Sequence, residues 1–349
     1  MMKFISGTSS MVRQVNRDLI REALKGMDGA SAADLARTTE LSVATCSHLI
    51  QELAETGEAI ELAPESQGGR PARRYAYNIN HSLAAVIMLL GVGEEVEFRH
   101  SVKNGAGISL ANGAEACSFF SLDQLDRLLS RLLREHPAIR SVALSVPGVV
   151  RDGEIQTCDI PVLVGMNLEQ HVAEKFGLRA ISEKDMNFAA IGYYSQNTRD
   201  IGSSLVYVTF PSDSCIGMGV IVNGILLKGK SAFAGEVEAI PTFSRRSAGK
   251  KGGARESLID RAATIAVSAI TMLNPDIFVM TGDLATPDLH DPVRNRCLEL
   301  IQEQHLPRFV IRPQCDEDVF VGMTAMALGR LTGDVKLVEK ERLWCGPVR

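Results

Sequence analysis

Three arginines lie close together in the stretch ESQGGRPARRY, residues 65–75, within a chain of 349 residues whose formal net charge is −5. Gly68 and Gly69 add backbone freedom, and Pro71 fixes φ and lacks an amide donor, so this stretch cannot be helical. Guanidinium groups on an extended loop suit contact with phosphates or entry into a nucleic-acid groove. The alternative is a solvated hairpin tip, and the flanking sequence decides between the two.

A row of small and polar residues lies on one side of a predicted helix that begins after Ser42 and stops at Gly57. Its apolar residues are predicted to point inward: Val43, Cys46, Leu49, Ile50 and Leu53. The opposite side carries Ala44, Thr45, Ser47, His48 and Gln51. Such side chains suit a helix that lies in the major groove and contacts base edges. The alternative is a three-helix packing unit with a polar outer surface.

The surrounding elements predict a winged helix-turn-helix domain over residues 1–80. Apolar residues at helical spacing predict a first helix that ends near Gly26: Val15, Leu19, Ile20, Ala23 and Leu24. Ser31, with Asp34 three residues later, predicts the capped start of a short second helix. After the third helix, residues 59–62 and 73–78 alternate like two strands of a hairpin. The arginine-rich stretch is the loop between these strands, and this position makes it a wing.

Composition limits the function further. Residues 1–80 hold nine Lys and Arg against ten Asp and Glu, so non-specific affinity for DNA is expected to be modest. The seven cysteines are scattered and form no CxxC pair, which predicts a reducing compartment without disulfides. No secretory signal opens the chain, and its longest apolar run is too short to span a bilayer. A cytoplasmic protein without membrane contact is therefore predicted.

Residues 81–349 alternate between strand-like and helix-like segments. Stretches such as AAVIMLL, SVALSVPGVV, SLVYVTF and DIFVMTGD read as buried strands, and a long apolar helix is predicted around residues 260–273. This alternation is typical of an α/β domain, here expected in two lobes.

The chain resembles the ROK family, which groups repressors, open reading frames and sugar kinases. The matching stretches are LSVATCSHLIQELAETG and GGRPARRY, followed by SVPGVV, SEKDMNFAAIGYY, CIGMGVIVNG, FAGEVEA and NPDIFVMTGD. The resemblance implies a winged helix and a two-lobed actin-like ATPase (ribonuclease H-like) domain. Regulators of this family bind palindromic double-stranded DNA operators as homodimers or homotetramers. It also implies that Gly69 and Arg70 form the wing tip, with Arg70 in the minor groove; Arg73 and Arg74 are expected to contact phosphates.

The sugar site that the resemblance implies is incomplete. The family's Asn-Asp pair reads Lys184-Asp185, so the acid remains and the sugar-binding Asn does not. If the two side chains face one another, the lysine is expected to hold Asp185 ionised and to lower its basicity. The Glu-x-Gly-His clamp keeps Glu236 but not the histidine. Asp185, at a vestigial catalytic-base position, and Glu236 are therefore the predicted ligand-binding residues, with ordinary hydrogen-bonded or exposed acids as the alternative.

The motifs for phosphate and metal are altered as well. An Asp-x-Gly-x-Thr run is expected at residues 89–94, which read LLGVGE. Gly217 and Gly219 leave room for an anion, although tight packing explains them equally, and Asp283 replaces a glycine after Gly282. The family's zinc-binding run is replaced by residues 244–257, without cysteine or histidine. Neither a metal nor another cofactor is predicted.

These features predict a DNA-binding transcriptional regulator, a repressor that senses a sugar or sugar derivative and has no kinase activity. Two alternatives stay open. One is a residual ATP-dependent sugar kinase that carries a DNA-binding domain. The other is a regulator whose second domain is an oligomerisation scaffold without a ligand.

Overall fold

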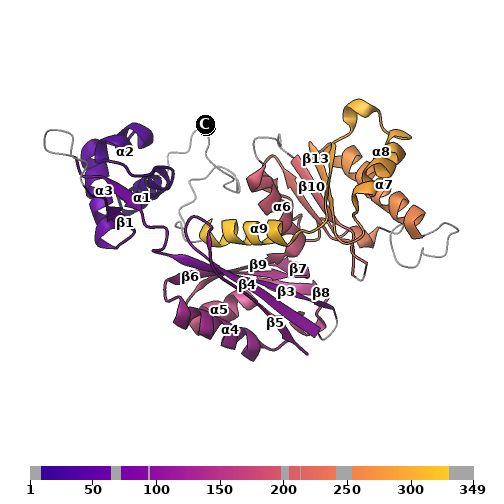
Figure 1. Ribbon diagram of the computed structural model, residues 1–349, viewed down its shortest axis with the longest axis horizontal. Coiled ribbons are helices and arrows are strands. Elements are labelled where there is room, and N and C mark those ends of the chain that lie inside the picture. The colour runs from indigo at the N-terminus through magenta and orange to yellow at the C-terminus, as the bar shows by residue number, and fades with distance from the viewer. Residues whose placement is uncertain are drawn as a thin grey trace.

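The computed structural model describes residues 9–63, 72–92, 95–197, 204–212, 214–240 and 254–329. Figure 1 shows a small N-terminal unit, in indigo, beside two larger lobes. The unit consists of α1 (Ser9–Lys25), α2 (Ala32–Thr39), α3 (Val43–Glu55), β1 (Ala59–Glu61) and β2 (Tyr75–Tyr77). Its apolar core is drawn from residues 20–77 alone. The predicted division at residue 80 falls in the turn that joins β2 to the next strand.

Side-chain caps set the starts of α2 and α3. Ser31 and Asp34 form a capping box, in which each side chain accepts a hydrogen bond from the other residue's amide. Ser42 Oγ accepts a hydrogen bond from the Thr45 amide at 3.1 Å. Between the two helices, Glu40 adopts the left-handed conformation, with φ 59°, which ends α2 and turns the chain. Both predicted helix starts are confirmed.

Two apolar side chains predicted to point inward are exposed instead. Val43 is 53% exposed because it is the first residue of α3, where the side chain projects past the helix start. Leu19 is 43% exposed because the buried side of α1 is centred on Ile20 and Leu24. The helical periodicity was right for the core, but the residues at its margins were misplaced.

Each lobe is built on a mixed five-stranded sheet with the same topology. The strand orders are β5-β4-β3-β6-β9 and β12-β11-β10-β13-β14. In both sheets the first three strands along the chain are antiparallel, and the last two are joined in parallel. This repeated order confirms the predicted ribonuclease H-like arrangement in two lobes.

The strands of the first lobe are β3 (Leu83–Val92), β4 (Glu95–Lys103), β5 (Ser109–Cys117), β6 (Ile139–Val146) and β9 (Arg179–Lys184), with a hairpin of β7 (Gly148–Arg151) and β8 (Glu154–Cys158). Those of the second are β10 (Ser204–Thr209), β11 (Met218–Val222), β12 (Ile225–Leu226), β13 (Ile277–Thr281) and β14 (Arg308–Arg312). The outer helices are α4 (Leu122–Glu135) and α5 (Leu168–Phe176) on the first sheet, and α7 (Ala254–Leu273) and α8 (His290–Leu298) on the second (Figure 1).

Two helices, α6 (Asp185–Gln196) and α9 (Asp316–Gly329), lie between the sheets and share one apolar core with both (Figure 1). They cross so closely that a Cβ on Gly192 would lie 1.8 Å from the Asp318 carbonyl oxygen. A Cβ on Gly322 would lie 2.0 Å from the Phe188 carbonyl oxygen. Only glycine fits at such a crossing. Because α6 follows β9 of the first sheet and packs on β10 and β11 of the second, its first residue lies where the lobes meet.

Candidate DNA-binding face and interlobe site

The outer side of α3 presents the side chains that the sequence singled out. The inner side of this helix is buried in the core of the N-terminal unit. On the outer side Ala44, His48 and Gln51 are exposed, and Thr45 and Ser47 are half-buried. These five residues lie on the outer side of one helix, as the base-contacting side chains of a recognition helix do. What they contact stays a prediction.

A groove lies beside this surface, between α1 and α3. It is lined by Val12, Arg13, Asn16, Ala44, Thr45, His48 and Leu49. The Arg13 side chain is 59% exposed and reaches across to Glu52 on α3. Sequence alone does not single out Arg13, because no spacing rule links a residue of α1 to one of α3.

The strands that carry the wing pair as predicted, with Ala59 opposite Tyr77 and Glu61 opposite Tyr75. Gly69 and Arg70, the predicted wing tip, lie outside the described residues. The strands therefore present a connecting segment on the same unit as α3, as a winged helix requires.

The two described wing arginines have different surroundings. The Arg73 side chain is 69% exposed, and its Nε lies 3.5 Å from Glu61 Oε1. Arg74 is half-buried, and its Nη2 donates a hydrogen bond to the Gly29 carbonyl oxygen at 3.0 Å. Arg74 thus connects the wing to the loop before α2. Of this pair, Arg73 is the side chain with room to contact a phosphate.

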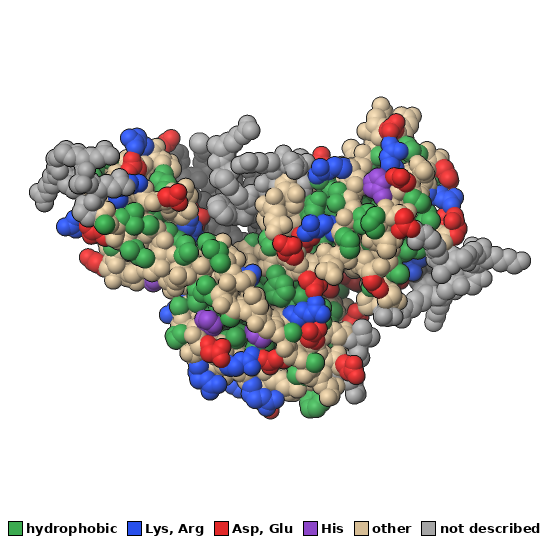
Figure 2. Space-filling view, viewed as in Figure 1, with side chains coloured by type: hydrophobic (Ala, Val, Ile, Leu, Met, Phe, Trp, Pro, Cys, Tyr) green, Lys and Arg blue, Asp and Glu red, His purple; other side chains and the backbone are tan. Residues whose placement is uncertain are grey.

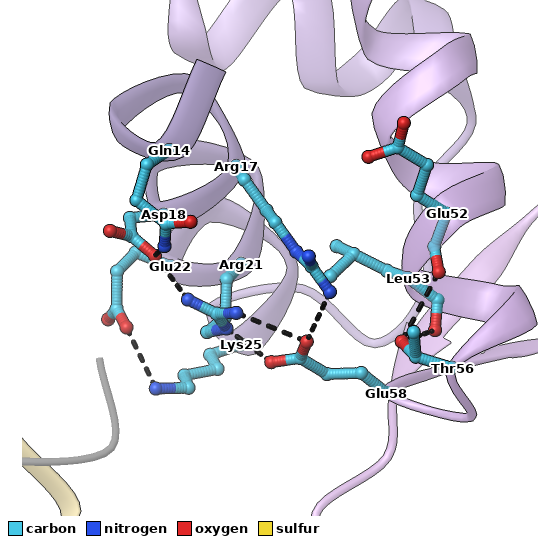
Figure 3. Close-up of polar contacts among 10 residues, drawn as sticks. All are labelled: Gln14, Arg17, Asp18, Arg21, Glu22, Lys25, Glu52, Leu53, Thr56 and Glu58. Atoms are coloured by element: carbon cyan, nitrogen blue, oxygen red, sulfur yellow. Dashed lines mark hydrogen bonds and ion pairs between the residues drawn. The ribbon is translucent and has the colours of Figure 1, made fainter. Parts of the chain in front are cut away.

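Other arginines of the N-terminal unit belong to a buried ion-pair cluster around Glu58 (Figure 3). Arg21 is 8% exposed and donates to Glu58 through Nε and through Nη2, the latter at 3.1 Å. Arg17 Nη2 lies 3.6 Å from the same carboxylate. Burial raises the pKa of Glu58, but the hydrogen bonds and charge of Arg21 outweigh it and leave the pKa lowered. These arginines attach α1 to the start of β1. On the face of the molecule shown in Figure 2, acidic and basic side chains are interspersed on the N-terminal unit.

At the junction of the lobes, Lys184 and Glu236 form an ion pair. Lys184 is the last residue of β9 in the first lobe, and Glu236 belongs to the segment after β12 in the second. Lys184 Nζ lies 2.8 Å from Glu236 Oε1 and 3.4 Å from the Ala234 carbonyl oxygen. The lysine side chain is 5% exposed and that of the glutamate 27%. Two side chains at the predicted sugar site therefore bind each other.

A second ion pair also joins the lobes, with its lysine in the second lobe and its glutamate in the first. Lys228 of the second lobe donates to Glu183 Oε2 of the first at 2.6 Å. Glu183 is 2% exposed, and its Oε1 also accepts from the Lys184 amide at 2.9 Å and from Asn187 Nδ2 at 3.0 Å. Three donors compensate the desolvation of this carboxylate. We refer to Lys184–Glu236 and Lys228–Glu183 as the crossed ion pairs.

Asp185, the predicted base position, has an acidity set mainly by burial. Burial raises the pKa of Asp185 to about 6, against the opposing effects of the Met186 amide and the charge of Lys184. The charge of Lys184 lowers this pKa, as expected, but burial outweighs it, and the lysine ammonium is directed to Glu236. A carboxyl group with this pKa can exchange a proton near neutral pH.

The glycines of the second phosphate motif serve packing. A Cβ on Gly219 would lie 2.1 Å from the Met186 carbonyl oxygen, and one on Gly217 would lie 2.9 Å from the Met186 side chain. The strand that carries them lies directly against the first turn of α6. Close packing, the alternative raised from the sequence, explains both residues.

The turn after β13 is held by a hydrogen-bonded side chain, that of Asp283. Gly282 has φ +98°, and a Cβ there would meet the Phe210 backbone at 2.7 Å. The Asp283 carboxylate accepts the Ser212 amide at 3.0 and 3.2 Å, and these bonds lower the pKa of Asp283. A negative charge thus occupies the turn where the family resemblance placed a second glycine beside a nucleotide.

Within the described ranges, no group of three or more His, Cys, Asp and Glu side chains is arranged to hold a metal ion. Most of residues 244–257 lies outside those ranges. Of the described histidines, His100 is buried, at 6% exposed, and packs over Gly113. The described helices include none long and apolar enough to cross a membrane.

Comparison with known proteins identifies a family for part of the chain. Residues 120–252 match the ROK family. The xylose repressor of Caldicellulosiruptor bescii is 22% identical over 244 residues, which are 66% of this chain and 59% of that protein. The xylose repressor of Bacillus subtilis is 20% identical over 239 residues, 65% of this chain and 60% of that protein. The chain thus spans about three fifths of the length of these curated relatives.

Solved structures share the fold. A ROK family transcriptional regulator, described as a homolog of the E. coli MLC protein, superposes with a TM-score of 0.65 at 14% identity, over 91% of this chain and 99% of that one. A putative N-acetylmannosamine kinase from Listeria monocytogenes gives 0.57 at 17% identity, over 71% and 99%. At these identities the likeness establishes the two-lobed actin-like fold and leaves the activity open.

Proposed function

We propose that the chain is a DNA-binding transcriptional regulator, acting as a repressor in the cytoplasm, since residues 120–252 match the ROK family. Its winged helix binds a double-stranded DNA operator, and its two-lobed domain has no kinase activity. The relatives named xylose repressor and the regulator structure support this assignment. The proposed assembly is a homodimer or homotetramer, because two copies of one winged helix match the two halves of a palindrome.

The observation that carries the proposal is the exposed outer side of α3 beside a two-stranded wing. Thr45, Ser47 and His48 offer donors and acceptors for base edges, and Ser42 fixes the helix start that presents them. Arg70 is assigned to the minor groove and Arg73 to a phosphate. Arg74 is assigned to the structure of the wing, given its bond to Gly29.

The effector is the least constrained part of the proposal. A sugar or sugar derivative would use Asp185 and Glu236, and the names of the relatives make xylose the first compound to test. Lys184 already donates to Oε1 of Glu236, so such a ligand shares this carboxylate with the lysine or replaces it. The crossed ion pairs therefore also favour the second candidate, a regulator whose two-lobed domain is an oligomerisation scaffold without a ligand.

One observation favours a residual sugar kinase. Asp185 keeps the position of a catalytic base, and a pKa of about 6 suits proton transfer at neutral pH. Against this role, phosphoryl transfer also needs a phosphate cradle and magnesium. The described turns at Gly217 and Gly282 are filled by the Met186 side chain and by the Phe210 backbone, and Asp283 adds a negative charge.

The decisive experiment selects DNA from a random or genomic library with the full chain and measures binding by fluorescence anisotropy. We expect a palindromic site, with His48→Ala altering base preference inside the half-site and Arg70→Ala losing roughly 1–3 kcal/mol and the preference for A·T pairs. Arg140→Ala, on the first lobe, is the control and is expected to bind as the wild type does. Failure to enrich any sequence would refute the proposal.

The effector and kinase alternatives need a separate assay. Thermal unfolding with xylose, glucose and their phosphates tests binding, because a ligand of the folded state raises the melting temperature. Incubation with ATP, magnesium and the same sugars tests catalysis. We expect no turnover; steady phosphorylation that is abolished in Asp185→Asn would establish the kinase instead.

A further inference from the structure

Glu52 joins the first and third helices on the proposed DNA-binding face. Its Oε1 accepts a hydrogen bond from Arg13 Nη2 and lies 3.0 Å from His48 Nε2. Arg13 Nη2 and His48 Nε2 are themselves 3.5 Å apart. One carboxylate on the fourth residue after His48 therefore holds two basic side chains that come from helices far apart in the sequence.

The exposure of the three groups differs in an informative way. The side chains of Arg13 and His48 are 59% and 67% exposed, whereas that of Glu52 is 20% exposed. The two basic groups thus face outward, and the carboxylate lies beneath them. Figure 3 shows that the Glu52 carboxylate points away from the ion-pair cluster around Glu58, so the two clusters are independent.

Arg13, His48 and Glu52 lie at the groove between α1 and α3 of the protein. Arg13 and His48 both line the groove between α1 and α3, together with Asn16 and Thr45. His48 is on the second turn of α3, from which a recognition helix contacts bases, and Arg13 lies to one side of it. A guanidinium in this place is suited to a phosphate that borders the major groove.

We propose that Arg13 is a further DNA-contacting residue and that Glu52 is a positioning residue, which presents Arg13 and His48 to DNA as one unit. This inference rests on the proposed function. A carboxylate close to DNA repels phosphates, so Glu52 lowers affinity for every sequence while it fixes the direction of both basic groups. Its net effect is to increase the preference for the operator over other DNA. Only a DNA site that offers a phosphate to Arg13 and a base edge to His48 gains both contacts.

The test compares Arg13→Ala and Glu52→Gln on the selected operator and on a scrambled duplex, at two salt concentrations. Arg13→Ala should weaken both duplexes roughly three- to ten-fold and reduce the salt slope by about one unit. Glu52→Gln should strengthen the scrambled duplex and lower the operator-to-scrambled ratio roughly ten-fold, since His48 and Arg13 lose their common orientation. Arg131→Ala, which breaks a similar exposed pair with Glu115 on the first lobe, is the control.

A measurement on the free protein tests whether Glu52 orients Arg13 and His48, independently of whether the protein binds DNA. In the free protein, the Arg13 side-chain NMR signals and the His48 ring signals should shift in Glu52→Gln and not in Arg131→Ala. If His48→Ala and Arg70→Ala weaken operator binding while Arg13→Ala binds both duplexes as the wild type does and Glu52→Gln leaves the operator-to-scrambled ratio unchanged, the inference is wrong and the proposed function stands. If no duplex binds the wild type, the proposed function fails and Arg13 loses its role with it.

Discussion

The face of α3 and the junction of the lobes each place carboxylates against basic side chains, but in opposite surroundings. On α3, the cations paired with Glu52 are 59% and 67% exposed. Between the lobes, Lys184 is 5% exposed and Glu183 2%. An exposed cation keeps most of its hydration and can exchange one anionic partner for another at small cost. A buried one cannot, because the abandoned partner is left as an unpaired charge.

This difference separates a surface built for a partner from a site filled by the chain itself. DNA phosphates can recruit Arg13 or Arg73 without breaking any buried contact. A sugar that reaches Glu236 meets a carboxylate that already accepts a hydrogen bond from the buried Lys184. The proposed DNA contacts therefore cost the chain no buried ion pair, whereas a ligand between the lobes competes with one.

The largest expected effect tests whether the buried pair is structural. Lys184→Met should lower the free energy of unfolding by about 3 kcal/mol, near the low end for a broken buried pair, because Glu236 is partly exposed. Urea unfolding followed by circular dichroism measures this. The double variant Lys184→Met, Glu236→Leu should recover most of the loss, since no charge is then left unpaired.

The matched control for this pair is the exposed one in the wing, Arg73 and Glu61. Arg73→Ala should change the free energy of unfolding by no more than about 0.5 kcal/mol. Equal losses in Lys184→Met and Arg73→Ala would remove the contrast between the two regions.

The second effect concerns the helix crossing beneath the interlobe site. Gly322→Ala should cost about 1–3 kcal/mol, because the new Cβ would lie 2.0 Å from the Phe188 carbonyl oxygen and must push α6 and α9 apart. Gly329→Ala, at the end of the same helix, meets no atom within 4 Å and should be neutral. Thermal unfolding of both variants decides whether the lobes depend on this contact.

The third effect is a pH dependence that arises from Asp185. Its folded-state pKa of about 6 lies above the ordinary value, so its contribution to stability is fully present below about pH 4 and is lost as the pH rises through 6. Asp185→Asn should therefore be more stable than the wild type at pH 7, by about 2 kcal/mol, and no more stable at pH 4.

Asp283→Asn serves as a control of opposite sign. The pKa of Asp283 is lowered by its bonds to Ser212, so the stability that it contributes is present above its ordinary pKa and lost in acid. Unfolding curves from pH 2 to 7.5 should show the difference between Asp283→Asn and the wild type shrinking below about pH 4, and the difference between Asp185→Asn and the wild type growing as the pH rises from 4 to 7. Parallel curves would mean that Asp185 is solvated like a surface carboxylate.

The fold could be predicted from the sequence wherever the determining signal is local. Ser31, Asp34 and Ser42 announce two helix starts by their spacing, and alternating residues announce the wing strands. The side of α1 that faces the core was only partly predicted, because Leu19 has the right spacing but lies at the margin. Marginal burial depends on the neighbours that a helix meets, which the sequence does not state.

The contacts of the two sites could not be predicted, because they join distant residues. Lys184 and Glu236 are 52 positions apart, and Arg13 and Glu52 are 39 apart. The family resemblance marked Lys184 as a departure, yet the partner of its ammonium, and with it the direction of the pKa of Asp185, follows from the packing of the two lobes. Arg13 carried no signal beyond its charge.

The smallest expected effect concerns two adjacent arginines of the wing. Arg73 is exposed, whereas Arg74 is half-buried and hydrogen-bonded to the Gly29 carbonyl oxygen. Arg74→Ala should lower the stability of the N-terminal unit by about 1 kcal/mol, because the hydrogen bond to the Gly29 carbonyl is lost. It should weaken DNA binding only through this loss of order. Arg73→Ala should leave stability unchanged and reduce the salt slope of DNA binding by about one unit. Hydrogen exchange of the α1–α3 amides reports the first effect, and anisotropy at two salt concentrations the second. A reduced salt slope in Arg74→Ala, with amide protection unchanged, would return Arg74 to the phosphate-contacting role that its position in the sequence first indicated.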